Sequence, residues 1–142
     1  MSQMTNYLEN KLVDHIFRNI SFTNPTGLWM SLHTANPGET GANEISGNNY
    51  SRAALAPSQS NWLSTNGSSS GPSTGTSGQT SNNAAITFPT PSGSWGTVTD
   101  FAIWDSATTG NCLLYGTLTI SKTINNGDTV SFAVSALTVT FA

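Results

Sequence analysis

From residue 27 onward, apolar residues recur at every second position in short runs that Gly, Asn, Pro or Ser separate. A period of two is typical of β-strands with one buried face, because successive side chains point to opposite sides of the backbone. The runs are GLWMSLH (27–33), YSRAAL (50–55), AAITF (84–88), GTVTDFAIWD (96–105), NCLLYGTLTI (111–120), DTVSFAV (128–134) and ALTVTFA (136–142). We therefore predict a mainly β fold, a compact antiparallel β-sandwich with a jelly-roll-like strand order.

Two of these runs carry more specific predictions. Alternation in the first strand predicts one buried face, formed by Leu28, Met30 and Leu32, and one face turned away from the core, formed by Trp29, Ser31 and His33. Asn126-Gly127 fits a two-residue type I′ turn, so we predict a β-hairpin across TINNGDTVSF (123–132).

One helix is predicted before the strands, in TNYLENKLVDHIFRNISF (5–22). Its apolar residues have the spacing of an amphipathic helix: Leu8, Leu12, Val13, Ile16, Phe17 and Ile20. Asn6 followed by Glu9 is typical of an N-terminal cap pair, and Asn24-Pro25 ends the pattern. We expect a single domain over residues 1–142, with the helix in 1–22 and the sandwich in 27–142.

Residues Ser64–Asn83 contain no charge, no aromatic ring and no aliphatic side chain larger than that of Thr. Such a segment has nothing apolar to bury that could offset the entropy of ordering its backbone. We expect a polar loop that projects from the sandwich, either as a solvated tip or lying across a neighbouring subunit.

The charge balance disfavours several classes of partner. Only 8% of the residues are charged and the net charge is −3, so no basic surface is available for nucleic acid or an anionic membrane. No run of about 20 apolar residues could span a membrane, and the first residues do not resemble a signal peptide. Synthesis in a host cytoplasm is expected, with the single Cys112 acting as a small buried apolar residue.

The inventory of reactive groups is small, with two His, seven carboxylates and one Cys. No GxSxG, HExxH or calcium-loop motif occurs, and Asp100 and Asp105 are predicted to project to opposite faces of one strand. A triad built on His33 stays open, but a satisfied or exposed histidine is the preferred interpretation. We expect no enzymatic activity, no catalytic residues, no cofactor and no metal site.

Four segments together resemble a family of small tailed-bacteriophage virion proteins, described as tail fibre proteins or as capsid cement proteins. They are YLENKLVDHIFRN, LWMSLHTANPGETGANEISGNNYSRAAL, SNNAAITFPTPSGSWGTVTDFAIWD and INNGDTVSFAVSALTVTF. The pattern E-x-x-G-x-x-Y-x-R is complete at Glu44, Gly47, Tyr50 and Arg52. The resemblance implies a structural component of the virion without catalytic residues.

The main hypothesis is a cement protein on the capsid exterior, which would bind the major capsid protein and copies of itself as a dimer or trimer. The expected interface residues are Tyr7, Leu8, Leu12, Ile16, Phe17, Tyr50, Arg52 and Trp62. The alternative is a tail-fibre or tail-tip component that binds a host-surface glycan through exposed aromatic residues, with Trp62, Trp95 and Tyr50 as candidates. For Arg52, a buried or interfacial pair with Glu44 and a solvated side chain are both open.

Overall fold

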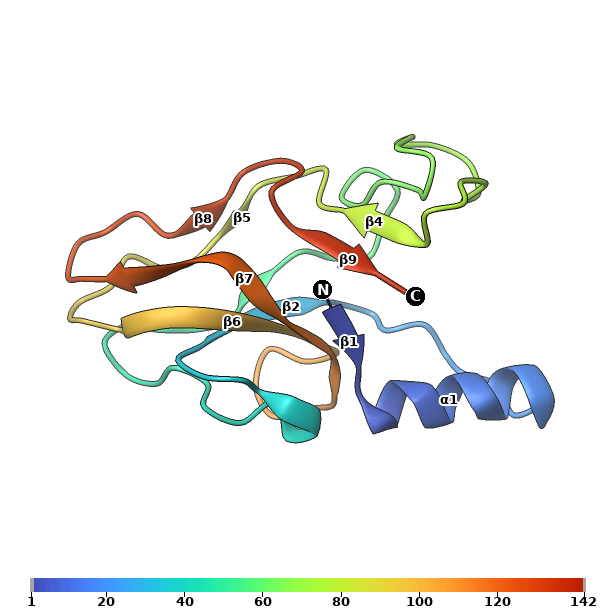
Figure 1. Ribbon diagram of the computed structural model, residues 1–142, viewed down its shortest axis with the longest axis horizontal. Coiled ribbons are helices and arrows are strands. Elements are labelled where there is room, and N and C mark those ends of the chain that lie inside the picture. Colours follow the sequence, from blue (N-terminus) through green and yellow to red (C-terminus); the bar gives the residue numbers. More distant parts are fainter. Residues whose placement is uncertain (1, 142) are drawn as a thin grey trace.

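The structure is a computed structural model that describes residues 2–141. Within this range the chain is mainly β with one α-helix, and all paired strands are antiparallel (Figure 1). The elements are β1 (Ser2–Met4), α1 (Asn6–Phe17), β2 (Trp29–His33), the short 3-10 helix η1 (Gly38–Thr40), β3 (Ala53–Ala54), β4 (Gln79–Ser81), β5 (Ile86–Thr87), β6 (Gly96–Trp104), β7 (Cys112–Ile124), β8 (Ser131–Phe132) and β9 (Thr138–Thr140). The predicted mainly β, antiparallel fold with one N-terminal helix is confirmed.

The largest sheet within residues 2–141 has five strands in the order β1-β7-β6-β2-β3. The long strands β6 and β7 form its centre, and Phe101 lies opposite Gly116. On the far side of β6, Trp104 lies opposite Trp29 of β2. The first described residues, β1, occupy the edge beside β7, so the chain start is held in the sheet before α1 begins.

Two smaller sheets, β4–β9 and β5–β8, lie beside the five-stranded sheet in the upper part of Figure 1. Their buried side chains Ile86 and Val139 belong to one hydrophobic cluster with Val98 and Phe101 of the large sheet. The shared cluster is the kind of core that a sandwich requires. The jelly-roll-like strand order stays a prediction.

The N-terminal helix is shorter than predicted: within the region 1–22, strand β1 precedes it, it begins at Asn6, and it ends at Phe17, so residues 18–22 are not helical. The predicted Asn6–Glu9 cap is wrong. Thr5 caps the helix by accepting a hydrogen bond from the Leu8 backbone N–H, and its fully buried hydroxyl donates to the Cys112 carbonyl at 2.6 Å. One residue thus caps α1 and ties its start to β7.

The prediction of one buried face for β2 is also wrong, since Met30, Ser31, Leu32 and His33 are all buried. Alternation does describe two faces, but the second face is covered as well. On this second face, the polar side chains of Ser31 and His33 hydrogen-bond to each other, and His33 also bonds to the Ala42 carbonyl. Burial therefore does not leave them without hydrogen-bond partners.

The predicted hairpin at Asn126-Gly127 does not form. A turn is present, with the Asp128 N–H donating to the Asn125 carbonyl at 3.2 Å, but only Gly127 of the central pair has a positive φ, whereas a type I′ turn needs two. The strand after the turn, β8, pairs with β5 instead of β7. The Gly127 N–H donates to the Pro91 carbonyl, so a tertiary contact directs the turn.

The polar segment 64–83 divides into two parts. Its last residues are structural: Gln79–Ser81 forms β4 beside β9, and Asn82 is fully buried. The Asn82 side-chain amide donates to the Ala84 and Ala133 carbonyls at 2.8 Å each and accepts from the Leu137 N–H at 2.9 Å. The expectation that the whole of 64–83 is a projecting loop is therefore wrong for its C-terminal end, which belongs to the body of the fold.

The first part of this segment is largely exposed and projects from the body, as predicted (upper right of Figure 1). Hydroxyl groups hold it together: the Gly75 N–H donates to the Thr65 hydroxyl at 2.8 Å, and the Ser77 hydroxyl donates to the Thr65 carbonyl at 3.1 Å. A chain without apolar side chains thus closes a loop through side-chain hydrogen bonds to its own backbone.

Candidate functional site

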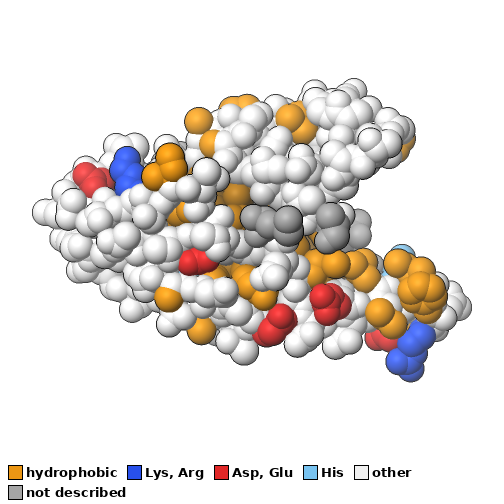
Figure 2. Space-filling model, viewed as in Figure 1, with side chains coloured by type: hydrophobic (Ala, Val, Ile, Leu, Met, Phe, Trp, Pro, Cys, Tyr) orange, Lys and Arg blue, Asp and Glu red, His pale blue; other side chains and the backbone are white. Residues whose placement is uncertain are grey.

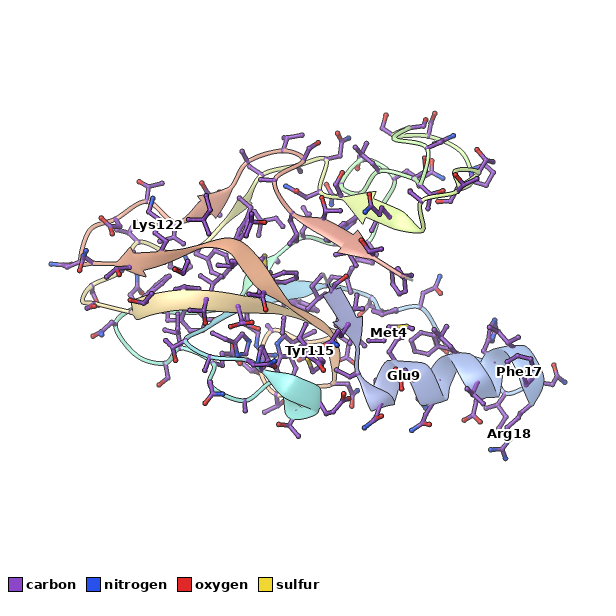
Figure 3. The ribbon with its side chains drawn as sticks, viewed as in Figure 1. Met4, Glu9, Phe17, Arg18, Tyr115 and Lys122 are labelled. Atoms are coloured by element: carbon purple, nitrogen blue, oxygen red, sulfur yellow. The ribbon has the colours of Figure 1, made fainter. Side chains whose placement is uncertain are left out.

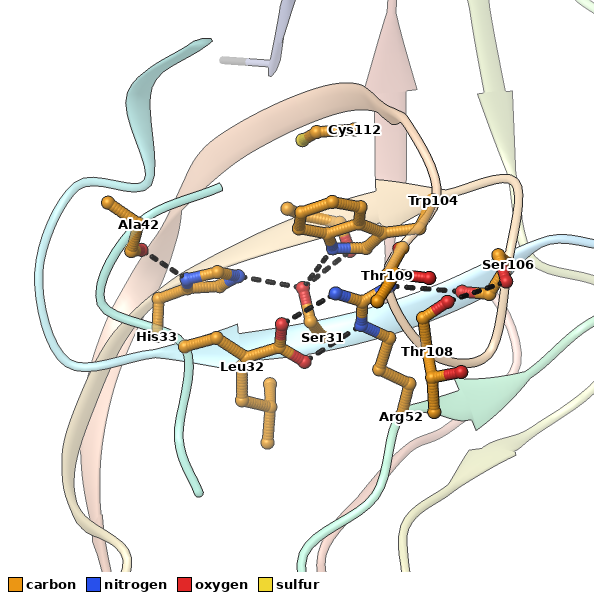
Figure 4. Close-up of polar contacts among 12 residues, drawn as sticks. Ser31, Leu32, His33, Ala42, Arg52, Trp104, Ser106, Thr108, Thr109 and Cys112 are labelled. Carbon is orange, nitrogen blue, oxygen red and sulfur yellow. Dashed lines mark hydrogen bonds and ion pairs between the residues drawn. The ribbon is translucent and has the colours of Figure 1, made fainter. Parts of the chain in front are cut away.

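Glu44 and Arg52 form a bidentate ion pair inside the fold (Figure 4). The Arg52 Nη2 lies 2.7 Å from Glu44 Oε2 and Nε lies 2.8 Å from Oε1, and 7% of the Arg52 side chain is exposed. The remaining nitrogen, Nη1, donates to the Ser106 and Thr109 carbonyls. The guanidinium therefore fastens the 105–111 loop to the residue just before β3.

Tyr50 completes the same cluster. Its hydroxyl accepts from the Leu32 N–H at 2.9 Å and donates to Glu44 Oε1 at 3.2 Å, and its ring packs edge-on against Trp95 with centroids 5.2 Å apart. Burial raises the pKa of the Tyr50 hydroxyl well above its usual value. Three of the four residues of the E-x-x-G-x-x-Y-x-R pattern, Glu44, Tyr50 and Arg52, thus meet in one hydrogen-bonded cluster.

Ser31 and His33 form a second polar group on β2. The His33 Nε2 lies 2.7 Å from Ser31 Oγ, its Nδ1 lies 2.7 Å from the Ala42 carbonyl, and the Trp104 indole N–H donates to Ser31 Oγ at 2.7 Å (Figure 4). Desolvation by burial lowers the pKa of His33, so the ring is neutral near pH 7. Both side chains are fully buried, and the ring meets a carbonyl where a triad would place a carboxylate.

The carboxylates on and beside β6 are also bonded internally. Asp100 accepts from the Thr99 and Thr117 hydroxyls, and Asp105 accepts from the backbone and side-chain N–H groups of Asn111. Within residues 2–141, no three His, Cys, Asp or Glu side chains are close enough together to hold a metal ion.

Cys112 is buried as predicted, and desolvation raises the pKa of its thiol to about 12.

The predicted docking residues of α1 fall into two groups. Leu8 is buried, and Tyr7 and Leu12 are partly buried against the core. Ile16 is 65% exposed and Phe17 is 80% exposed. Figure 3 shows Phe17 and Arg18 at the end of α1 that projects away from the sheet, far from Met4. The first half of the helix therefore docks on the body, and the second half leaves its apolar side uncovered.

An apolar groove of about 400 Å³ lies between α1 and the body. Its lining includes, besides Leu8 and Leu12, the residues Phe22, Pro25, Leu28, Pro57, Ser58, Trp62, Thr80, Ile103, Leu113, Leu114, Val139 and Phe141. The predicted residue Trp62 belongs to this groove, where its indole N–H donates to the Leu55 carbonyl at 3.3 Å. Three of the predicted interface residues, Leu8, Leu12 and Trp62, thus meet at one place.

A smaller recess of about 170 Å³ lies next to Trp62, on the side of the polar loop. Apart from Trp62, Leu63 and Gly71, its lining residues carry hydroxyl or amide groups: Ser58, Gln59, Ser64, Ser68, Ser70 and Ser73. No charged residue lines this recess. Trp95 and Tyr50, the other candidates for ligand stacking, pack against each other in the interior.

A larger cleft of about 550 Å³ runs between β7 and residues 128–136. Leu32 and Val98 line it together with one charged residue of each sign, Lys122 and Asp128. None of the predicted interface residues lines this cleft, and its mixed lining does not define a ligand.

Sequence reasoning missed the residues that organise the polar cluster, above all Trp104 and Gly41. An added Cβ at Gly41 would collide with the Trp104 ring, and Gly41 has a φ of +67°. The sequence signal was the second Gly in NPGETGANE, Gly41. In a stretch rich in turn-forming residues, one more Gly does not stand out as a position with a special contact.

Comparison with known families gives one match, and it covers nearly the whole chain. Residues 3–140 match the family described as Podophage GP4 fiber I protein gp80. No curated protein sequence matches the chain. Among residues 2–141, no helix is long and apolar enough to cross a membrane. The predicted resemblance to tailed-phage virion proteins is confirmed, and the chain belongs to the podophage GP4 fiber I protein gp80 family.

Proposed function

We propose that this chain is a non-enzymatic structural component of the phage tail fibre apparatus and that it acts through binding surfaces. The observation that carries the proposal is the family match over residues 3–140, whose description names a fibre protein. The internal bonding of Ser31, His33 and Asp100 supports a role without catalysis, since these groups are occupied or inaccessible.

The family description favours the tail over the capsid exterior, which was the main expectation from the sequence. The uncovered apolar end of α1 would serve an assembly at either location, so it does not distinguish them. The location of the chain in the virion is therefore the property that distinguishes a tail-fibre component from a capsid cement protein.

Cryo-electron microscopy of the parent particle tests this proposal. We expect density for this chain in the tail fibres, fitted by the five-stranded sheet with α1 projecting from it. Density distributed over the shell and in contact with the major capsid protein would overturn the tail assignment and favour cement.

We further propose that the recess beside Trp62 binds a neutral host-surface sugar. An aromatic wall with hydroxyl and amide neighbours suits a sugar ring, whose faces are apolar and whose rim carries hydroxyls. The absence of charge from the recess favours a neutral glycan over an acidic one.

A glycan array followed by titration of the best sugar tests the recess. Ser70→Phe would fill it, whereas Ser69→Phe places the same ring on the same loop outside the lining and serves as the control. Both positions are exposed, so folding is expected to persist in both variants. Loss of sugar binding in Ser70→Phe alone supports the site. Equal binding by both variants, or no binding by the native chain, contradicts it.

A further inference from the structure

Two strand edges border the cleft of about 550 Å³ between β7 and residues 128–136. β7 pairs with β6 on one side and with β1 on the other, but β1 reaches only residues 114–116. β8 pairs with β5 on one side, and no strand described within residues 2–141 pairs with its other side. The turn at 125–128 thus joins β7 to β8 without pairing them, and the cleft separates the two strands (left half of Figure 1).

Part of β7 also lacks partners in β6. Lys122 lies opposite Val98 and Thr117 lies opposite Asp100, so residues 118–121 of β7 stand against the single residue Thr99. Among the described strands, neither β6 nor β1 supplies a partner residue to these four positions. Such a bulge leaves backbone N–H and carbonyl groups outside the ladder, and unpaired backbone at a sheet edge can pair with another chain.

β8 directs backbone groups toward the cleft from the opposite side. Phe132 lies opposite Ile86 of β5, and the Val130 carbonyl accepts from the Phe88 N–H at 2.9 Å. In an antiparallel ladder every second residue bonds to the same neighbour, so Ser131 turns its N–H and carbonyl away from β5. Ser131 lines the cleft, which therefore has unpaired backbone on both walls.

β1 shows that this fold accepts an extended segment beside β7. It lies antiparallel to β7, with Ser2 opposite Gly116. The Ser2 hydroxyl donates to the Thr140 carbonyl at 3.0 Å and accepts from the Thr140 N–H at 2.8 Å, so β1 also contacts β9. The cleft begins at Leu118 and continues along the same strand, β7.

We propose that the cleft binds an extended segment of another protein of the virion, which adds as a strand between β7 and β8. The segment joins the five-stranded sheet to the β5–β8 sheet through its own backbone. The side chains of the cleft do not define a ligand, but unpaired strand edges on two facing walls fit an extended polypeptide. The inference names a partner for the proposed fibre component, and only the source of the segment rests on that proposed function.

The two facing edges favour a segment of another protein over a second copy of this chain. An occupant of the cleft must offer two free backbone edges, one to each wall. Every strand described within residues 2–141 is already paired on at least one side. The exposed part of the polar loop has no apolar side chains to face the cleft, and its hydroxyls bond to its own backbone.

The lining of the cleft defines the chemistry of the segment. Leu32 and Val98 line it, and each is 1% exposed. Lys122 and Asp128 add one charge of each sign, so the lining is neutral as a whole. Figure 2 shows few charged side chains on this face, and Figure 3 labels Lys122 at its left end. We expect a segment of about five or six residues, the usual length of a strand, with apolar side chains at alternate positions and no net charge.

A peptide array probed with the full chain tests the proposal. The array carries overlapping peptides of about ten residues, enough for one strand with flanks, from all other proteins of the parent particle and from this chain. We expect a neutral peptide with alternating apolar residues, from another virion protein, to bind. No binding peptide, or binding by peptides of this chain alone, overturns the proposal.

Two variants of β7 test whether the bound peptide lies in the cleft. Thr119→Trp fills the cleft, which Thr119 lines, whereas Ser121→Trp places the same ring on the same strand outside the lining. Both positions are exposed, and melting curves check that both variants fold. Thr119→Trp is expected to weaken binding about 10-fold or more and Ser121→Trp to leave it unchanged. Equal affinity of the two variants for the peptide contradicts the site.

Hydrogen exchange of the native chain tests the backbone contact itself. In the free chain we expect amides at 118–121 to exchange faster than those at 114–116, which lie between β1 and β6. The bound peptide should slow exchange at 118–121 and at Ser131. A proline in the middle of the peptide should weaken binding, because it removes a backbone donor. Binding without this protection overturns strand addition.

The outcome of these experiments is independent of the position of the chain in the particle. The array includes capsid and tail proteins alike, so a chain found on the capsid could still bind a strand in the cleft. A chain found in the tail fibre could equally fail to bind any peptide. The proposed function and the strand-binding cleft can therefore fail separately.

Discussion

The guanidinium carbon of Arg52 lies 3.7 Å from the centroid of the Trp104 ring. The same guanidinium holds Glu44 through two hydrogen bonds, so one side chain joins a stacking contact, an ion pair and a loop anchor. Trp104 in turn donates to Ser31, which links the ion pair to the buried His33. Ser31, His33, Glu44 and Arg52 are thus parts of one structural cluster around Trp104.

Replacement of Arg52 is expected to destabilise the fold strongly. Arg52→Ala leaves Glu44 partly buried without its partner, which costs about 3 kcal/mol of unfolding free energy, and Arg52→Lys about 2 kcal/mol because the bidentate and stacking contacts are lost. Urea unfolding measures both values. Arg18→Ala is the control: its side chain is 66% exposed, and loss of its pair with Asp14 is expected to change stability by about 0.5 kcal/mol or less. Equal effects at both positions would contradict the cluster's structural role.

Asn82→Ala is expected to reduce the unfolding free energy by about 3 kcal/mol. The substitution removes three hydrogen bonds and leaves the Ala84 and Ala133 carbonyls and the Leu137 N–H without that partner in the interior. Asn66→Ala, in the exposed part of the polar loop, should cost about 0.5 kcal/mol or less. Chemical denaturation of the two variants side by side decides the point, and a neutral Asn82→Ala would show that the segment after β4 is not anchored by this residue.

Gly41→Ala should be far more damaging than Gly47→Ala. Both positions have a positive φ, so each substitution carries about 1–2 kcal/mol of backbone strain. Only at Gly41 would the new Cβ also collide with the buried Trp104 ring, which its contacts with Ser31 and Arg52 hold in place, adding about 1–3 kcal/mol. Thermal and urea unfolding measure the difference, and equal losses would exclude a specific role for the Gly41–Trp104 contact.

The stability of the protein should fall as the pH drops below about 6.5. The pKa of His33 is lowered in the folded state, so the unfolded chain binds a proton more readily than the native chain does. The contribution of His33 to the free energy of unfolding is fully present above the pKa that the ring has in the unfolded chain. It is lost as the pH falls from there through the lower pKa of the folded state. Unfolding midpoints between pH 7 and pH 5 should show this decline in the native chain and in His15→Gln, but less of it in His33→Gln. If the native chain, His15→Gln and His33→Gln lost the same stability over this pH range, the decline would come from titratable groups other than His33.

Local pattern predicted much of the fold, with identifiable exceptions. The strands at 96–105 and 111–120 and the amphipathic character of α1 follow from residue spacing and appear in the structure. The hairpin at Asn126-Gly127 failed because a turn signal cannot specify which strand the following residues pair with, and contacts with Pro91 and β5 decide that. The burial of Asn82 was invisible because its partners lie as many as 55 residues away in the sequence.

The sequence by itself determined the secondary-structure class, the family and the apolar stripe of the helix, because periodicity and motif spacing are properties of neighbouring residues. The tertiary structure alone decided which of those side chains are covered. It buried Ser31 and His33 on the second face of β2 and left Ile16 and Phe17 in solvent. Burial depends on what the chain places opposite a residue, and that partner comes from distant segments whose positions no local pattern encodes.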